Sequence, residues 1–443
     1  MKVWTILILA FCLPAAAQTP AEKAPLTVQE AVTIALDRYP DVAKVRSAAD
    51  ALKGTIREVR SQALPQVTFD ANGVRSRDPS FLNASAFDNF PEELRNAMRP
   101  EASNLFNYSV NVSQPLYTAG KIGTALKLAA VESEGAAADI NRTLQDLARE
   151  VVKSCYGLMW ADRYRSLVAE TQQQRKMHAE MARTRLANGV ATEVDLLRSE
   201  VAVANGAPEL VRADNAIRQA RALLNFYLVR PLDYPTQIIG DFKEQAWEQW
   251  NLETLAQEAS LRRPDLERLR IAERSAAVQL DLARAENRLR LDSNASYGIS
   301  ARRPENLVKS LFASWRFSVS LKLPLFDGYK RDGMIYQATA SQRIARLERE
   351  KVEQQLRLQL QQGTDELKAA TETIAAARAN IQQAEKVLKM TQENYKFGAA
   401  TTLDIVDAQT ALSLARNNLL RGLYDYSVAR ANLLWTAGRS PWE

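Results

Sequence analysis

Four stretches of the chain alternate between apolar and polar residues, which is the period of a β-strand with two different faces. The clearest two are residues 106–113, Phe-Asn-Tyr-Ser-Val-Asn-Val-Ser, and residues 315–323, Trp-Arg-Phe-Ser-Val-Ser-Leu-Lys-Leu. A weaker version precedes each of them. Such alternation is typical of a membrane β-barrel strand and equally of a soluble sheet with one wet face, so alone it leaves both open. It predicts strands at about 66–76, 106–117, 291–300 and 315–326.

Two long segments without strand alternation follow, residues 121–188 and 330–397, each 68 residues in length. Both have helical patterns, and at 1.5 Å per residue each helix would be roughly 100 Å long. Shorter helical segments at 41–63 and 265–289 can stack end to end with a returning helix. The second long segment also carries a heptad of apolar and small residues, the spacing of a coiled-coil seam: Ile374, Ala377, Ile381, Ala384, Leu388, Thr391 and Tyr395.

Each long segment is followed by the same pattern of a glycine and a threonine. Gly189 and Gly398 stand where a glycine can adopt the left-handed conformation that ends a helix. Thr192 and Thr401 follow, and each can cap a returning helix. The sequence therefore predicts two helical hairpins, at about 121–230 and 330–437.

The chain is an internal duplication. Pro115 and Pro324 lie in equivalent motifs after the second strand of each half, and they are 209 residues apart, as are Gly189 and Gly398. We expect these prolines to mark the transition from strand to helix, because proline cannot donate to the strand ladder. The motif Arg38-Tyr39-Pro40-Asp41 recurs as Arg262-Arg263-Pro264-Asp265, 224 residues later, so the first half has about fifteen extra residues, which we assign to a longer loop between its strands. We divide the chain into a first repeat (18–230), a connecting segment (231–250) and a second repeat (251–443).

The composition of the chain predicts that the protein is exported. Residues 1–17 carry Lys2, an apolar run and three alanines, the pattern of an export signal rather than of a transmembrane helix, which needs about 20 apolar residues. Cys12 is preceded by Phe11, which disfavours a lipoprotein, and Cys155 would be the only cysteine of the mature chain. The net charge of +6 is spread evenly along the helical segments and forms no basic stripe, so no nucleic-acid partner is expected.

The export signal is followed by two copies of one pattern, which consists of a strand pair, a proline, a long helix, a Gly-Thr turn and a returning helix. This pattern resembles that of the TolC family of outer-membrane efflux proteins. The resemblance runs from about Leu26 to Trp435, and its most specific part is Tyr395 to Ala411. It implies a mainly α protein with membrane β-structure, in which duplicated hairpins form an α-barrel coiled coil in the periplasm. Three chains would contribute four strands each to a 12-stranded β-barrel.

The resemblance also implies a function and partners. The chain would be the passive outer-membrane channel of a tripartite efflux or type I secretion system, a homotrimer docked to a periplasmic adaptor and an energised inner-membrane pump. The adaptor would dock at the two turns, which contain Gly189, Thr192, Gly398 and Thr401.

Acidic residues follow both turns. Asp195 and Asp404 each lie three residues after a capping threonine, where a carboxylate can reach back to the helix start. Asp407 lies one turn beyond Asp404, whereas the first half has Arg198 at the equivalent position. By resemblance, Asp404 and Asp407 would line the narrow periplasmic entrance and select for cations, and we call them the entrance carboxylates.

The entrance of the family's members is held closed by a basic residue just before the Thr-Thr-Leu-Asp run, which links to an aspartate of the other hairpin with help from a tyrosine. Asp195 and Tyr395 match the aspartate and the tyrosine, but Ala400 occupies the basic position. That contact cannot form in this chain, so closure would have to depend on other contacts.

Two other classes of protein fit the sequence less well. An enzyme is disfavoured, since no catalytic pair, phosphate loop, metal cluster or cofactor motif is present, and His178, the single histidine, lies among charged residues where a surface position is expected. His178 and the few methionines suggest no metal relay. A periplasmic adaptor or coiled-coil scaffold shares the export signal and a long hairpin, but an adaptor normally has one hairpin, whereas this chain has two.

Overall fold

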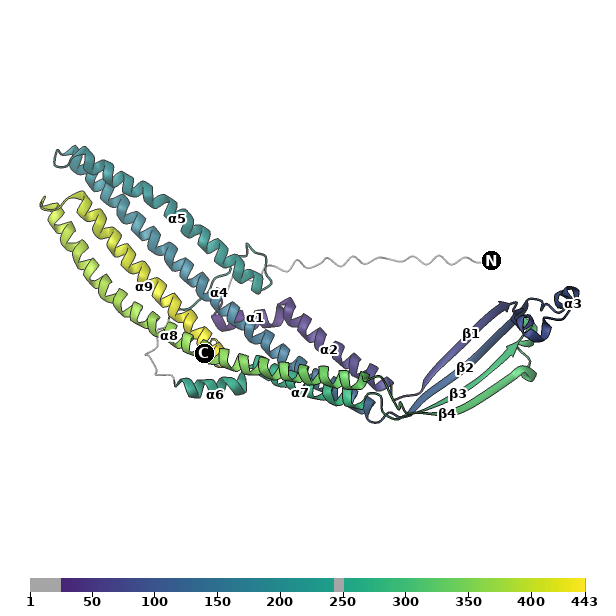
Figure 1. The fold of residues 1–443 in the computed structure, drawn as a ribbon. Coiled ribbons are helices and arrows are strands. Elements are labelled where there is room, and N and C mark those ends of the chain that lie inside the picture. Colours follow the sequence, from purple (N-terminus) through teal and green to yellow (C-terminus); the bar gives the residue numbers. More distant parts are fainter. Residues whose placement is uncertain (1–24, 243–250, 443) are drawn as a thin grey trace, which may run out of the picture. The chain divides into compact units, whose positions relative to one another are not determined.

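A computed structural model describes residues 25–242 and 251–442 of the 443-residue chain (Figure 1). The predicted export signal (1–17) and the end of the predicted connecting segment lie outside these residues. The described elements occur twice in the same order: two shorter helices, two strands, one long helix and one returning helix. The duplication in sequence is therefore also a duplication in structure.

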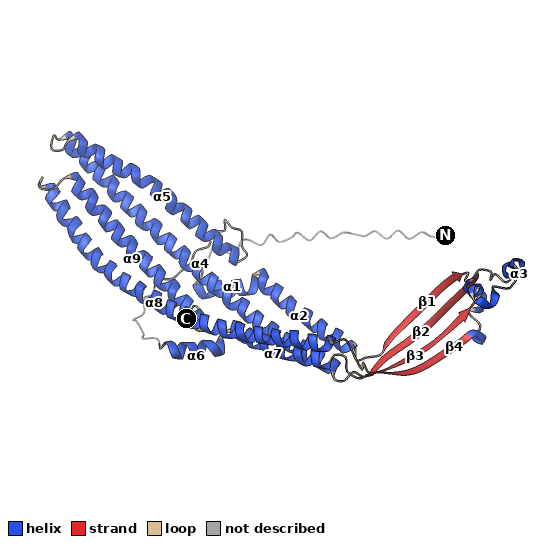
Figure 2. Ribbon diagram, viewed as in Figure 1, coloured by secondary structure: helices blue, strands red, loops and turns tan. Residues whose placement is uncertain are grey.

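The four strands form one antiparallel sheet in the order β1 (Gln66–Ser76), β2 (Ser103–Tyr117), β3 (Arg290–Ala301) and β4 (Ala313–Lys322) (Figure 2). Their register continues the sequence alternation from strand to strand, because Val67 pairs with Val112, Val112 with Ala295, and Ala295 with Phe317. The neighbouring row is polar, and consists of Thr68, Asn111, Ser296 and Arg316. One face of the sheet is thus apolar across all four strands.

The two prolines differ in position. Pro115 lies within β2, at a shift in the pairing with β3, two residues before the strand ends. Pro324 lies two residues after β4, which ends at Lys322 and not near 326 as the alternation predicted. Proline has no N–H to donate, so the ladder must skip one residue in the first case and stop in the second.

Between strand and long helix each repeat contains two adjacent residues with positive φ. They are Ala119 (49°) and Gly120 (84°) in the first repeat, and Gly328 (65°) and Tyr329 (64°) in the second. Because residues with a Cβ seldom adopt this conformation, its recurrence at the same place in both repeats, at Ala119 and at Tyr329, indicates that the link from strand to helix requires left-handed backbone, which the sequence pattern had not indicated.

The two hairpins have equal lengths. α4 (Lys121–Ala187) and α8 (Lys330–Lys396) each have 67 residues, and α5 (Glu193–Tyr227) and α9 (Thr402–Thr436) each have 35. The predicted heptad of α8 is a buried seam, where Ala384 and Leu388 pack against Ala408 and Leu412 of α9. The remaining α-helices are α1 (Val28–Arg38), α2 (Pro40–Ser61), α3 (Glu92–Ala97), α6 (Leu252–Arg262) and α7 (Pro264–Ala285).

The hairpins differ in one respect, because α5 contains Pro208 in its interior. A proline inside a helix removes a backbone hydrogen bond. Close to it, the Gln172 side-chain amide of α4 donates to the Val203 carbonyl at 2.9 Å, and Gly206 leaves the room that this side chain occupies. The Gln172 side chain of α4 thus gives a hydrogen bond to a backbone carbonyl of α5 close to Pro208.

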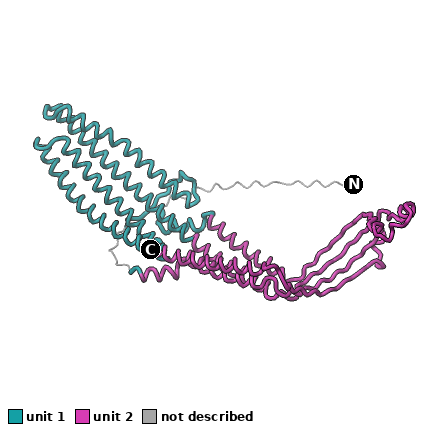
Figure 3. Tube along the Cα trace, in the orientation of Figure 1, with its two compact units in different colours: residues 1–40, 144–252, 360–443 teal, residues 41–143, 253–359 magenta. Residues whose placement is uncertain are grey.

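The described chain divides into two compact units, shown in different colours in Figure 3. One contains residues 1–40, 144–252 and 360–443, and the other contains 41–143 and 253–359. Each unit contains segments from both repeats. None of the helices in residues 25–242 and 251–442 is long and apolar enough to cross a membrane.

Candidate functional site at the hairpin tips

We call residues 185–198 and 394–407, the ends of the two hairpins, the tips. Both tips contain the same turn. In the first, Gly189 donates to the Leu186 carbonyl and Val190 to the Arg185 carbonyl, both at 2.9 Å. Gly398 and Ala399 repeat this pair of bonds in the second tip. The φ angles of Gly189 (72°) and Gly398 (74°) confirm the left-handed conformation expected of these glycines.

Both returning helices begin with a capping box. The Thr192 hydroxyl accepts from the Asp195 amide, while the Asp195 carboxylate accepts from the Thr192 amide at 3.1 Å and from its hydroxyl at 2.7 Å. Thr401 and Asp404 make the same bonds, with both carboxylate distances at 2.7 Å. Capping is thus confirmed for both aspartates, and in this respect the two tips are alike.

These bonds lower the pKa of both capping carboxyls. For Asp195 the largest cause is the hydrogen bond from the Thr192 hydroxyl, followed by the one from the Thr192 amide. For Asp404 the amide of Thr401 comes first and its hydroxyl second. Both side chains are therefore anionic at neutral pH. Asp407 is exposed on α9, one turn further along.

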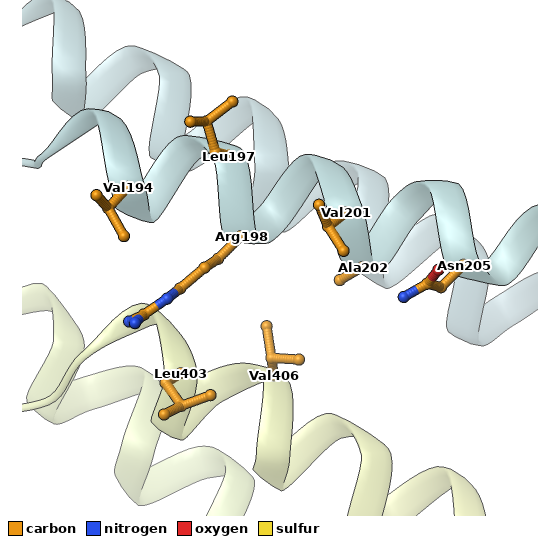
Figure 4. A pocket seen from close by; sticks show the side chains of 8 residues that line it. All are labelled: Val194, Leu197, Arg198, Val201, Ala202, Asn205, Leu403 and Val406. Atoms are coloured by element: carbon orange, nitrogen blue, oxygen red, sulfur yellow. The ribbon is translucent and has the colours of Figure 1, made fainter.

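An apolar groove of about 390 Å³ lies between α5 and α9 at the tips. Figure 4 shows Arg198 extending from α5 toward the two α9 residues that line it. Most of the other lining side chains are apolar and about half exposed in the single chain. The residues of this tip groove are Val194, Leu197, Arg198, Val201, Ala202, Asn205, Leu403 and Val406.

Tyr395 of the second hairpin contacts side chains of the first hairpin. It is buried, and the Arg185 guanidinium of α4 donates to its carbonyl at 2.7 Å and lies 4.4 Å from the centre of its ring. Its hydroxyl lies 3.3 Å from that of Thr402. Arg185 thus joins α4 of the first hairpin to α8 of the second, a contact that sequence reasoning did not identify.

The surface position expected for His178 is wrong. Its side chain is 6% exposed, and its ring meets that of Tyr395 edge-on, with centroids 5.5 Å apart. Burial lowers the pKa of His178, which keeps the imidazole neutral at physiological pH. No group of three or more His, Cys, Asp or Glu side chains in residues 25–242 and 251–442 could hold a metal ion.

Comparison with known proteins identifies relatives along most of the described chain. The sequence profile described as "Outer membrane efflux protein" matches residues 31–228 and 255–439. The chain is 26% identical over 322 residues to Protein CyaE of Bordetella pertussis, covering 71% of this chain and 63% of that protein. It is 22% identical over 409 residues to Outer membrane protein TolC of Vibrio cholerae, covering 91% and 89%.

The fold has solved counterparts as well. The Campylobacter jejuni CmeC outer membrane channel superposes with a TM-score of 0.79, covering 94% of this chain and 87% of that chain. The sequence identity in this superposition is 16%, so the likeness is one of fold.

Proposed function

Because the chain belongs to the outer membrane efflux protein family, we propose that it is the outer-membrane channel of an efflux or secretion system. It acts as a passive conduit between periplasm and exterior, and carries out no catalysis. Its relatives include Outer membrane protein TolC of Vibrio cholerae and Alkaline protease secretion protein AprF of Pseudomonas aeruginosa, which supports a channel and not an adaptor or scaffold.

The four-stranded sheet is the main observation that supports this proposal. β1 and β4 are its edges, and an open edge in a bilayer leaves backbone groups unsatisfied at a cost of several kcal/mol each. Four strands are also too few to enclose a lumen. Pairing β4 of one chain with β1 of the next removes every edge once three chains have joined, which gives a twelve-stranded barrel. The apolar face of the sheet, on which Phe69 is 68% and Trp315 79% exposed, then faces lipid.

The tips form the docking site for a periplasmic adaptor that connects the channel to an inner-membrane pump. Gly189, Thr192, Gly398 and Thr401 fix the backbone of both turns, and the tip groove supplies exposed apolar surface next to them. Such surface is unfavourable in water unless a partner covers it. A helical hairpin with apolar residues at every third or fourth position suits a groove between two helices.

The entrance of the channel lies at the same tips. Three copies of the entrance carboxylates, Asp404 and Asp407, gather six negative charges around the axis, and these attract cations. The contact between Arg185 and Tyr395 holds the two hairpins of one protomer together, and so takes the place of the contact that Ala400 prevents.

Membrane fractionation followed by native mass spectrometry tests the proposal. We expect a trimer of the processed chain, extracted from the outer membrane. A folded monomer in the periplasmic fraction would overturn it.

Docking is tested by Gly189→Ala and Gly398→Ala, since both positions have positive φ and a Cβ is strained there. Adaptor pull-down should be lost while the trimer stays inserted. Gly333→Ala in α8 is the matched control, because its backbone is helical and nothing lies within 4 Å of the added Cβ. Normal adaptor capture by both tip variants would remove the turns from the docking site.

A further inference from the structure

A second cavity near the tips is formed by α4, α8 and α9, and has a volume of about 280 Å³. Met177, His178 and Met181 of α4 line it, opposite Tyr395 and Lys396 of α8. Side-chain amides and Ile405 complete the lining. Both methionine side chains are about half exposed, at 54% and 46%, so the cavity can be reached from solvent.

We infer that Met177, His178 and Met181 form a binding site for a soft monovalent metal cation, Cu(I) or its analogue Ag(I). The three residues fall within an arc of about 100° on one helix face, because successive residues are separated by 100°. Met177 and Met181 are one turn apart, and His178 lies beside them. Two thioether side chains and one imidazole therefore line the same cavity from one helix, and we place the ion among them.

The donor atoms decide which metal is bound. Thioethers prefer Cu(I) over hard cations, and imidazole binds copper well. Mg²⁺ and Ca²⁺ require oxygen ligands, and no carboxylate lines the cavity. Lys396 adds a positive charge to the lining, which opposes a divalent ion more strongly than a monovalent one.

The imidazole is available to act as a ligand. His178 Nε2 is buried and has no hydrogen-bond partner in the described structure. An unpaired buried polar atom is costly, and a bound cation next to the ring compensates for part of that cost. The thiol of Cys155 does not compete, because it is fully buried and burial raises its pKa to about 12.

The single histidine of the chain provides a direct measurement. Full-length protein without a histidine tag, labelled with ¹³C at the histidine Cε1, gives the one ring signal of His178. Titration with silver nitrate in chloride-free buffer should shift that signal until one Ag⁺ per chain is bound. The double variant Met177→Leu/Met181→Leu should weaken this binding at least tenfold, since leucine keeps the volume but lacks the sulfur.

Met390→Leu is the matched control, because Met390 is an exposed methionine of α8 outside the cavity and its replacement should leave the titration unchanged. Calcium chloride, added separately, should produce no shift. The inference is overturned if tenfold excess Ag⁺ leaves the wild-type signal in place. It is also overturned if the double variant responds like the wild type, or if Ca²⁺ causes the same shift.

Discussion

Replacing Arg185 by methionine tests whether this side chain stabilises the contact between the tips of the two hairpins. Methionine retains much of the apolar stem and removes the guanidinium. The variant therefore loses the 2.7 Å hydrogen bond to the Tyr395 carbonyl and the stacking over the Tyr395 ring at 4.4 Å. The turn itself should persist, because Arg185 takes part in it only through its backbone carbonyl.

The expected magnitude follows from these two contacts. A hydrogen bond from a charged donor contributes about 1.5–3 kcal/mol, and a cation–π contact about 0.5–2 kcal/mol. Arg185 is only partly buried, and contributions at one site are not additive, so we expect a loss of about 2 kcal/mol. This corresponds to a roughly 30-fold larger population in which the two tips have separated.

Amide hydrogen exchange measures this population. In Arg185→Met, exchange at residues 180–190 and 390–400 should be about 30-fold faster, and conductance in planar bilayers should rise as the entrance loosens. Arg183→Met is the matched control. Arg183 forms ion pairs with Glu180 (2.8 Å) and Glu200 (2.9 Å), all within the first hairpin, and these exposed pairs contribute little.

The control should leave exchange at residues 390–400 unchanged. If Arg185→Met also leaves it unchanged, or if the control accelerates it equally, the contact with Tyr395 does not hold the hairpins together.

Three further predictions concern the tips and the helices that support them. Gly206→Ala forces a Cβ onto the side-chain oxygen of Gln172 and should destabilise the protein by about 1–3 kcal/mol in chemical denaturation, whereas Gly157→Ala, with nothing within 4 Å, should not. Converting both entrance carboxylates to asparagine should lower cation selectivity in bilayer recordings, most clearly at low salt; unchanged selectivity would leave them a structural role only. Because the folded pKa of His178 is below its unfolded value of about 6.5, unfolded chains take up the proton first, so stability should be full above pH 6.5 and fall as the pH drops below it. The substitution His178→Leu should remove that part of the pH dependence of stability, which thermal unfolding at several pH values would measure.

The hairpins and strands could be predicted because their signals are local. Gly189 and Thr192 end one helix and cap the next through bonds within a few residues, so the first turn was legible from sequence spacing. The alternation of residues 106–113 likewise determines which side chains share a face of β2. The duplication then supported each prediction with a second copy.

The contacts between hairpins could not be predicted, because they depend on which helix faces meet. Arg185 stands in the last turn of α4, where a basic residue is expected from the helix dipole alone. His178 is surrounded in sequence by charged residues, and its burial follows from packing of α4 against the second hairpin. The small residues Ala179 and Ala182, which are buried beside it, were the available signal.

The unequal connections between paired strands show where the chain accepts changes in length. The first, residues 77–102, is 26 residues long, and the second, residues 302–312, has 11, while the helices of the two repeats have kept identical lengths. One inserted residue in α4 would rotate every later side chain by about 100° and misalign the tips. An epitope tag or a reporter peptide should therefore be accommodated between residues 80 and 100, where surface labelling of intact cells could report assembly without disturbing export.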